Sequence, residues 1–535
     1  MDYPVETFTE DERALLAPHV TNLDRPVFAL VNLPETVKGA LFARYSRYQG
    51  TLRRLYLDEF ATTAPGGHVP AWETAEGQRA AELYERIFLG YGDDSVAQLG
   101  GMHVAAEWTS NVLTKVLQRP RLASYLEQST RYIAYDTPMD GPRGSRYRYY
   151  RDDALGPAYA AAMDEIFGVY SAALPRVTAW IDGQFPGDPS PARTRAIQAK
   201  AFDLLRGVLP AASLSHMGIY ASGQSYEQLI LHLLAHPLPE AREYGAGILE
   251  AVQAVMPSFV SRVERPDRGG EWVSYLQERD AGAARWVQRL GLGGGVESGG
   301  DAHASVKLLH VDGDEDALLA SMLFEAAGTG EEETRIRVAA LSADEQARLL
   351  ADLIGERRNR RHRPGRGFEA LRYRFEIVAD YGAFRDLQRH RMLTVQWQQL
   401  TPHLGAGVPE EIDAAGSGDE VRRAFAVSHD AWQRLVDAGQ PRAAPYALCL
   451  GYRIRFVLDL NAREAMQLIE LRSGREGHPS YRAVAHEMHR QIAEVHPAVA
   501  AAMTYIDRDT EPRLERILSE MRTQAKLEAR SPGGS

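Results

Sequence analysis

The chain has 535 residues, of which 44% are hydrophobic and 25% are charged, and its formal net charge at pH 7 is -11. This is the composition of a soluble globular protein, and at ~150 residues per domain the length predicts two to four domains. The acidic balance disfavours a general nucleic-acid binder, although a local basic patch can override it. The single cysteine, Cys449, excludes a disulfide framework or a thiolate metal cluster within one chain.

The N-terminal residues Met1 to Glu6 carry acids where a signal peptide has cations. No later apolar run approaches the ~18 residues that a membrane-spanning helix needs. We therefore expect a cytoplasmic protein with no membrane partner.

The first half carries an arginine motif behind a predicted long helix, Val96 to Leu117. The motif begins with a glutamine and two arginines that flank a proline, Gln118, Arg119, Pro120 and Arg121. Polar residues follow at intervals: Ser124, Glu127, Ser129, Arg131 and Tyr132. Arginines packed beside hydroxyls and amides favour an anionic phosphate ligand over a solvated surface. Further on, Arg206 precedes Gly-Val-Leu-Pro, and the last helix of this half is predicted to open at Glu240.

A glycine-rich stretch, Gly291 to Gly300, cannot hold a helix or strand and predicts a linker. Its interpretation as a phosphate loop is weak, because no strand leads into it and no Gly-Lys-Ser/Thr ends it. Beyond it, Ser305 to Val311 has the pattern of a strand and Ala317 to Phe324 that of an apolar helix. The patterns predict two related domains and a linker: residues 1–290, 291–303 and 304–535.

The second half is predicted to repeat the order of the first. A helix with some strand character, Phe368 to Leu387, precedes a second arginine motif about 270 residues after the first. That motif is Leu-Gln-Arg-His-Arg with a polar tail: Leu387, Gln388, Arg389, His390, Arg391, Thr394, Gln398 and Gln399. A helix is predicted to open at Ser480, and a charged helix, Leu514 to Ala529, closes the chain.

Both motifs resemble the signature of the flavin-dependent thymidylate synthases, which is Arg-His-Arg, seven residues, then Ser. In the first half the resemblance rests on Arg119 to Tyr132, Gly92 to Gln98 and Arg206 to Pro210. In the second half it rests on the intact Arg-His-Arg and on Asn-x-Arg and Leu-Arg: Arg389, His390, Arg391, Asn461, Arg463, Leu471 and Arg472. The resemblance implies an α+β fold of two tandem thymidylate-synthase-like domains, each a mixed β-sheet with long helices.

The two halves depart from the family pattern in complementary ways. The first half has Ser222-Gly223-Gln224 in place of Asn-x-Arg, and by spacing it has His232 where the family has its reactive-site arginine. The second half has lost the substrate loop, where four other residues replace Glu, Ser, Arg and Arg: Trp397, Gln399, Thr401 and Pro445. In the upstream segment, Asp93 and Gln98 replace the family's His and Glu.

Because the family assembles each active site from several subunits of a homotetramer, the resemblance implies a homodimer of this chain that forms a pseudo-tetramer of domains. Such an assembly would have two classes of active site instead of four equal ones. One class would keep all its functional residues, and the other could lose them. The hypothesis is a composite site with Arg472 as its catalytic residue. Its substrate-binding residues are Gln118, Arg119, Glu127, Ser129, Arg131, Arg206 and Arg389. Its cofactor-binding residues are Arg389, His390, Arg391, Asn461, Arg463 and Gln467.

The resemblance implies an FAD-dependent enzyme that methylates C5 of dUMP, or of a related pyrimidine nucleotide such as UMP or dCMP. Methylenetetrahydrofolate would be the carbon donor and NADPH the electron source. A Ser hydroxyl and an arginine fork suit a nucleotide phosphate, a role that Ser129 and Arg131 fit. A cationic Arg472 would stabilise charge that builds on the pyrimidine, so no protein nucleophile is required. The flavin supplies the redox step.

The alternative from another class is a catalytically inactive scaffold of the same fold that binds a nucleotide or RNA. The basic run Glu356 to Arg366 is its best support, and this run could also bind cofactor phosphates or a folate glutamate tail, or be a solvated basic loop. Arg472 could be a surface arginine of a helix, and Asn461 a helix N-cap. His486 and His489 are one residue too close for a zinc-binding His-Glu-x-x-His helix, so no metal is assigned.

Overall fold

The computed structural model describes residues 6–24, 28, 30–35, 37–38, 41, 51–61, 98–131, 133–139, 145–292 and 303–509. Three of the segments discussed above lie wholly or mostly outside these residues. They are Gly92 to Gln98, of which only Gln98 is described, the glycine-rich linker beyond Leu292, and the closing helix Leu514 to Ala529. The described residues belong to two compact units. The first unit comprises Met1–Thr109, Val116–Gln128 and Ser215–Gly295, and the second comprises Ser110–Lys115, Ser129–Leu214 and Val296–Ser535.

Residues 110–115 and 129–214 of the first half group with the second half in the second unit, so the compact units are not the same as the two halves of the sequence. The second unit therefore contains the end of the first arginine motif as well as the whole of the second. A site that draws on both halves of the sequence can be described within this one unit.

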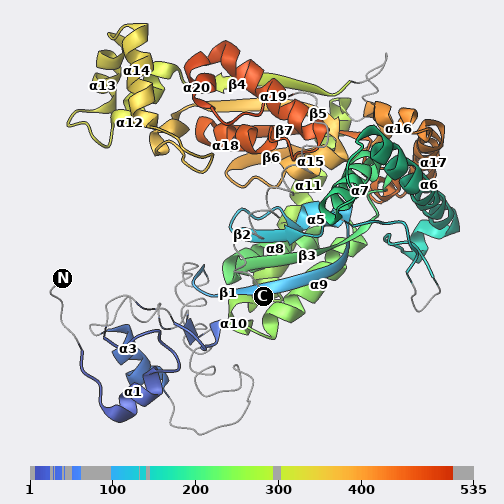
Figure 1. Ribbon diagram of the computed structural model, residues 1–535. Coiled ribbons are helices and arrows are strands. Elements are labelled where there is room, and N and C mark those ends of the chain that lie inside the picture. Colours follow the sequence, from blue (N-terminus) through green and yellow to red (C-terminus); the bar gives the residue numbers. More distant parts are fainter. Residues whose placement is uncertain are drawn as a thin grey trace, which may run out of the picture. The chain divides into compact units, whose positions relative to one another are not determined.

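The first unit is built on a three-stranded sheet of order β1-β3-β2 (Figure 1). Its strands are β1 (Gly101–Ser110), β2 (Ala123–Glu127) and β3 (Leu214–Ser222). Its longer helices follow in chain order: α8 (Gly223–Ala235), α9 (Pro239–Gln253) and α11 (Glu271–Arg289). Shorter elements complete the unit: α1 (Glu10–Leu16), α3 (Leu52–Leu55), η1 (Tyr56–Phe60), α10 (Pro257–Val260) and η5 (Pro266–Gly270).

The predicted long helix Val96 to Leu117 is wrong over most of its length. Strand β1 occupies Gly101–Ser110, and only α5 (Asn111–Leu117) is helical. Two glycines, Gly100 and Gly101, stand where the helix would run, and glycine disfavours a helix interior. Val104 and Ala106, two residues apart, are buried, which is the alternation of a strand.

The second unit is built on a four-stranded sheet of order β4-β5-β7-β6. Its strands are β4 (Ser305–Asp312), β5 (Arg372–Asp380), β6 (Leu393–Trp397) and β7 (Arg453–Asn461). All described strand registers, in both units, are antiparallel, whereas mixed sheets had been predicted. The predicted strand at Ser305 to Val311 is confirmed as β4.

One face of the second sheet is the core of this unit. Along β7, alternate residues are fully buried, among them Phe456 and Leu458, because successive side chains of a strand point to opposite faces. Helix α18 (Ala462–Arg472) packs against β7, and α19 (Pro479–Val495) packs against β4 and β5 (Figure 1). The predicted helix opening at Ser480 is confirmed as α19.

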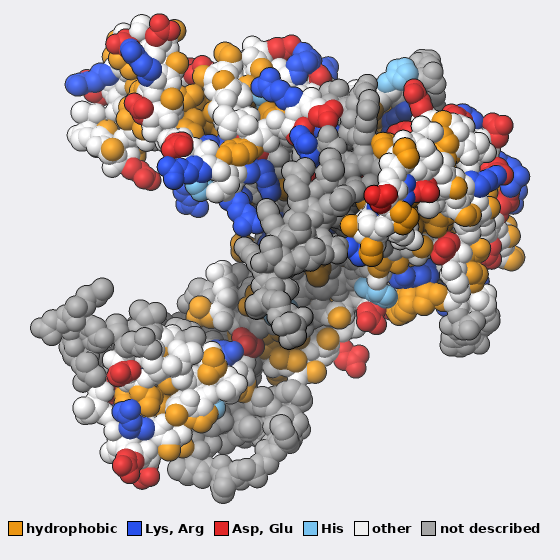
Figure 2. Space-filling model, in the orientation of Figure 1, with side chains coloured by type: hydrophobic (Ala, Val, Ile, Leu, Met, Phe, Trp, Pro, Cys, Tyr) orange, Lys and Arg blue, Asp and Glu red, His pale blue; other side chains and the backbone are white. Residues whose placement is uncertain are grey.

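The remaining helices of the second unit form two further groups. Helix α6 packs against α7 and α17, with α16 nearby, and α12 packs against α13 and α14. Figure 2 shows charged and hydrophobic side chains intermingled over the exposed surface of α13 and α14. No described helix is both long and apolar enough to cross a membrane. The bounds are α6 (Gly156–Gln184), α7 (Pro191–Leu205), α12 (Glu315–Leu323), α13 (Glu331–Ala339), α14 (Ala343–Ile354), α15 (Tyr381–Leu387), α16 (Glu410–Ala414), α17 (Gly418–Asp437) and α20 (Pro497–Ala502).

The order of elements around the sheets occurs twice. In the first copy a strand, a short helix and a strand (β1, α5, β2) are followed, after intervening helices, by a strand and two helices (β3, α8, α9). In the second copy the same order is given by β5, α15 and β6, then β7, α18 and α19. The architecture is thus an α+β fold with an internal repeat.

Candidate functional site

Arg206 follows the last residue of α7 and points its guanidinium at two carboxylates, that of Asp380, the N-cap of α15, and that of Asp386 within α15. Its Nη1 donates to Asp386 Oδ2 at 3.1 Å, and its Nη2 lies 3.6 Å from Asp380 Oδ1. Gly382 makes this approach possible, because a Cβ there would lie 2.8 Å from Arg206 Nε. The side chain of Arg206 is 4% exposed, and its Nη2 finds no hydrogen-bond acceptor among the described residues.

Asp386 contacts two of the predicted arginines, Arg206 and Arg389, and is influenced by the charges of two more. Arg389 pairs with its Oδ1, one turn further along the chain. Burial alone would raise the pKa of Asp386, but the charges of four arginines lower it far below its usual range. We call Asp386 and these four residues the arginine cluster: Arg131 and Arg206 from the first half of the sequence, Arg389 and Arg472 from the second.

Arg131 is held by a second buried carboxylate. Its Nε and Nη2 donate to the two oxygens of Asp203 at 2.5 and 2.6 Å, and its Nη1 donates to the hydroxyl of Tyr481 at 3.1 Å. Burial raises the pKa of Asp203, and the charge and hydrogen bonds of Arg131 lower it by more. Ser129, two residues before, accepts a hydrogen bond from the backbone N–H of Arg131 at 3.2 Å.

Tyr481 links Arg131 to the predicted catalytic arginine. The Arg472 guanidinium carbon lies 5.5 Å from the centre of the Tyr481 ring, at a distance where the cation is attracted by the ring face. Arg472 is the last residue of α18, and its Nε lies 3.1 Å from His390 Nε2. The other ring nitrogen of His390, Nδ1, lies 2.9 Å from Glu464 Oε1.

The predicted cofactor residues lie along α18 or beside it. Asn461 is the N-cap, since its Oδ1 accepts a hydrogen bond from the backbone N–H of Glu464 at 2.9 Å. Arg463 Nε donates to the carbonyl of Pro364 at 2.9 Å, and Gln467 stands half-buried one turn further along the helix. Arg391 is exposed.

Three predicted substrate-binding residues belong to the first unit. Gln118 Nε2 donates to Glu127 Oε2 at 2.9 Å. Partial burial of the Arg119 side chain together with the charge of Arg279 lowers its pKa, and the charge of Asp280 opposes this shift. Burial also lowers the pKa of His232, and the charges of Arg119 and Arg279 add to the effect.

Helix caps correct the predicted equivalence of His232 and Arg472. Ser222 caps α8 as Asn461 caps α18, and Arg472 is the eleventh residue after its cap. The eleventh residue after Ser222 is Leu233, which is fully buried, and His232 comes one residue earlier. The first unit therefore has an apolar side chain at the position of the predicted catalytic arginine.

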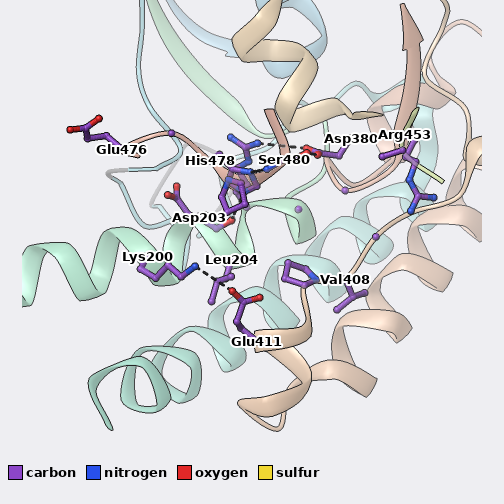
Figure 3. A pocket seen from close by; sticks show the side chains of 18 of the residues that line it. Lys200, Asp203, Leu204, Asp380, Val408, Glu411, Arg453, Glu476, His478 and Ser480 are labelled. Atoms are coloured by element: carbon purple, nitrogen blue, oxygen red, sulfur yellow. Dashed lines mark hydrogen bonds and ion pairs between the residues drawn. The ribbon is translucent and has the colours of Figure 1, made fainter. Parts of the chain in front are cut away.

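A cavity of about 320 Å³ adjoins the arginine cluster within the second unit. This volume falls within the ~300–1,000 Å³ typical of small-molecule sites. Figure 3 shows side chains of α7, of the loop before α16 and of the start of α19 pointing into it. Its polar lining residues are Lys200, Asp203, Arg206, Asp380, Glu411, Arg453, Arg475, Glu476, His478 and Ser480.

His478 and Ser480 shape the wall of this cavity at the start of α19. His478 Nε2 lies 3.1 Å from the carbonyl oxygen of Asp203, and its Nδ1 accepts from the backbone N–H of Ser480 at 3.2 Å. Burial lowers the pKa of His478 to about 4, and the charge of Arg206 adds to the effect. Ser480 Oγ donates to Asp380. Neither residue lies in a motif with a predicted functional role, and Ser480 is predicted only as the start of a helix.

In the basic run and in the histidine pair of α19, side chains make contacts within the fold. Arg357, in the basic run, forms a buried bidentate pair with Glu470 at 2.6 and 2.7 Å, while Arg358 is exposed. His486 and His489 lie within hydrogen-bond distance of backbone carbonyls, those of Asp507 and Ala500. Among the described residues, no group of three or more metal-ligating side chains lies close enough to hold an ion.

Comparison with known proteins defines the class of this chain. Residues 53–258 and 309–498 each match the family described as thymidylate synthase complementing protein. The chain belongs to this family, and the two matched regions make it a tandem member.

Two relatives match this chain over nearly their whole length. The chain is 36% identical to a UPF0159 protein of Chlamydia muridarum, over 97% of this chain and 99% of that protein. It is 29% identical to UPF0159 protein Ta1429 of Thermoplasma acidophilum, over 91% of this chain and 99% of that protein. A solved structure, a UMP/dUMP methylase from Streptomyces cacaoi bound with 5-Br dUMP, superposes with a TM-score of 0.31 at 20% identity, covering 39% of this chain and 98% of that one. Family membership supports a thymidylate-synthase-like methylation of a nucleotide.

Proposed function

We propose that the chain is a flavin-dependent enzyme that methylates C5 of dUMP or of a related pyrimidine nucleotide. Methylenetetrahydrofolate would donate the carbon and NADPH the electrons. The observation that carries the proposal is the arginine cluster, in which arginines of both sequence halves meet within one compact unit. Family membership supports the reaction class.

The arginine cluster suits an anionic substrate. A nucleotide monophosphate is close to a dianion at neutral pH, and guanidinium groups bind its oxygens through directed, charge-assisted hydrogen bonds. The buried Nη2 of Arg206 is a donor of this kind: it makes no hydrogen bond to the described residues, and the nearest carboxylate oxygen, Asp380 Oδ1, lies 3.6 Å away. In the proposal, Arg131, Arg206, Arg389 and Ser129 bind the nucleotide.

Arg472 would act on the pyrimidine. Methylation at C5 requires negative charge to build on the ring, and a cation fixed beside a ring carbonyl stabilises that charge in the transition state. The contacts of Arg472 with His390 Nε2 and the Tyr481 ring hold the guanidinium in place before substrate binds. A preorganised cation is worth more than one that must reorient.

The side chains along α18 have the right chemistry for a flavin ring. Asn461 and Gln467 carry amide N–H groups and Arg463 a guanidinium, which are donors for the carbonyl and nitrogen acceptors of the isoalloxazine. All three are partly exposed, so a ligand can reach them. When bound, a reduced flavin would supply the hydride that turns the transferred carbon into a methyl group. Arg389, His390 and Arg391 were also predicted to contact the cofactor.

The proposal includes a homodimer that forms a pseudo-tetramer of domains, with Gln118, Arg119 and Glu127 completing sites from the first unit. Sedimentation equilibrium of the full chain tests this part. A dimer supports it, and a monomer that turns over substrate contradicts it.

The first experiment is the visible absorption spectrum of the freshly purified full chain, with any released cofactor identified. A bound flavin, and methylation of dUMP, UMP or dCMP in the presence of methylenetetrahydrofolate and NADPH, are the expected results. If the protein takes up no flavin even when FAD is added, the redox proposal fails. RNA binding in that case would favour the scaffold alternative.

A further inference from the structure

Both ring nitrogens of His390 are engaged inside the second unit. Nδ1 lies 2.9 Å from Glu464 Oε1, and Nε2 lies 3.1 Å from Arg472 Nε. The side chains of His390 and Glu464 are 4% and 5% exposed, so water does not compete for these contacts. Glu464 and Arg472 lie on the same helix, in its first and last turns, and His390 bridges them from the second arginine motif.

The chemistry of the partners fixes which nitrogen carries the proton. Arginine Nε–H only donates, so His390 Nε2 must be the bare acceptor. Nδ1 then carries the hydrogen and donates it to the Glu464 carboxylate. Burial lowers the pKa of His390, and the charges of Arg472 and Arg389 add to this while Glu464 opposes it. The neutral ring with Nδ1–H is therefore the form that satisfies both neighbours.

We propose that His390 is a positioning residue: oriented by Glu464, it fixes the Arg472 guanidinium in its reactive orientation, and it is not a ligand of the cofactor. This deepens the proposed function and rests on it for what Arg472 does. A ring whose two nitrogens are already engaged has no hydrogen-bonding group left for a flavin. The Tyr481 ring and His390 contact the same guanidinium, so Arg472 is restrained by two neighbours.

The internal repeat supports this interpretation, because the first half has no counterpart of His390, Glu464 or Arg472. Counting from the arginine motif, Pro120 stands for His390. Counting from the helix caps, Ser225 stands for Glu464 and Leu233 for Arg472. A cofactor ligand could persist without Arg472, whereas a residue that positions Arg472 has no task once that arginine is lost.

Two substitutions separate the contacts of His390. A glutamine at this position places its amide oxygen near the site of Nε2 and can still accept from Arg472, whereas an asparagine reaches only the site of Nδ1. We expect His390→Asn to lower kcat by at least about tenfold, since a misplacement of ~1 Å can cost ~100-fold. His390→Gln should restore most of the loss, and KM for the nucleotide should change far less than kcat in both variants.

Thermal unfolding of both variants checks that each is folded. Flavin titration checks the competing role, in which His390 is a ligand of the cofactor. Equal losses of kcat in two folded variants would overturn the proposal, as would a loss of flavin affinity that saturating flavin repairs. Should neither variant fold, Glu464→Gln serves instead. It keeps the shape of the acceptor but removes the charge that orients the ring, and it should lower kcat without weakening flavin binding.

The histidine tautomer gives a test that does not depend on turnover. Nitrogen NMR of the full chain with ¹⁵N-labelled histidine, assigned with His390→Gln, should show a protonated Nδ1 and a bare Nε2 for His390. This pattern should persist between about pH 6 and 8, around the ordinary pKa of histidine. A protonated Nε2 overturns the positioning role even in an active enzyme. The expected tautomer in a chain that methylates no pyrimidine nucleotide rejects the proposed function but leaves the positioning of Arg472 intact.

Discussion

Arginines of the same motif have different surroundings in the two compact units. In the first unit, partial burial and the positive charge of Arg279 lower the pKa of Arg119, and the negative charge of Asp280 opposes this shift. In the second unit, Arg389 pairs with a buried carboxylate that Arg206 also contacts, and the charges of Arg472 and Arg131 further lower the pKa of this carboxylate. The sequences explain this contrast, because Asp386 stands three residues before Arg389 and Val116 stands three residues before Arg119.

This contrast teaches that the arginine motif alone does not make a site. Several guanidinium groups in a partly buried space repel one another, and an anion must hold them together before substrate arrives. In the second unit Asp386 takes that place, and Asp203 does the same for Arg131.

The largest effect is expected from Asp386→Asn. Removing one partner of a buried ion pair leaves uncompensated charge and costs about 3–5 kcal/mol of unfolding free energy. Chemical denaturation of the full chain measures the loss. The matched control is Asp413→Asn, which breaks a pair with Arg422 whose side chains are both about half exposed, and surface pairs are worth only ~0–1 kcal/mol. Similar losses in the two variants would show that Asp386 does not hold the cluster together.

The next effect concerns turnover. Arg472→Ala should lower kcat by about 10²–10³-fold, the usual cost of removing one preorganised donor that stabilises developing charge. Steady-state methylation of dUMP or UMP measures it. His232→Ala removes the histidine nearest the equivalent position of the first unit, and it should leave kcat close to that of the wild type. A comparable loss in both variants would mean that the first unit also carries chemistry.

The sequence motifs contain the arginines of the cluster and, three residues before Arg389, the acid Asp386, but they do not contain the acids that lie far along the chain. Arg131, Arg206 and Arg472 stand in motifs with fixed spacing. Asp203 and Glu464 carry no such signal, because each meets its partner across more than 70 residues of sequence, 72 for Arg131 and 74 for His390. Only the fold brings such pairs together, and a sequence does not show whether an acidic residue is buried or exposed.

A third prediction uses acid pH to probe the cavity beside the arginine cluster. His478 has its pKa lowered to about 4 by burial and by Arg206 and Arg131, with Asp203 and Asp380 opposing. In the unfolded chain its pKa is about 6.5, so below that pH the unfolded state binds more protons. The unfolding free energy should therefore fall as the pH drops from about 6.5 to about 4, by up to ~1.4 kcal/mol per pH unit from this residue.

His478→Gln should flatten that part of the stability profile, as measured by denaturant unfolding at several pH values. His429→Gln, at an exposed histidine, is the control and should keep the wild-type slope. An unchanged slope in His478→Gln would mean that the acid sensitivity of the chain arises elsewhere than at the wall of this cavity.

The smallest effect separates two roles of Asn461, which caps α18 and is proposed to bind the flavin. Loss of a cap costs about 1 kcal/mol, so Asn461→Ala and its first-unit counterpart Ser222→Ala should destabilise the chain by similar amounts. Asn461→Asp keeps the cap but loses the amide N–H donor. If Asn461 binds the flavin, flavin affinity measured by titration falls in Asn461→Asp while stability does not, and Ser222→Ala shows the reverse. A cap with no cofactor role would leave flavin affinity unchanged in Asn461→Asp, and the two units would then differ at this position in sequence but not in function.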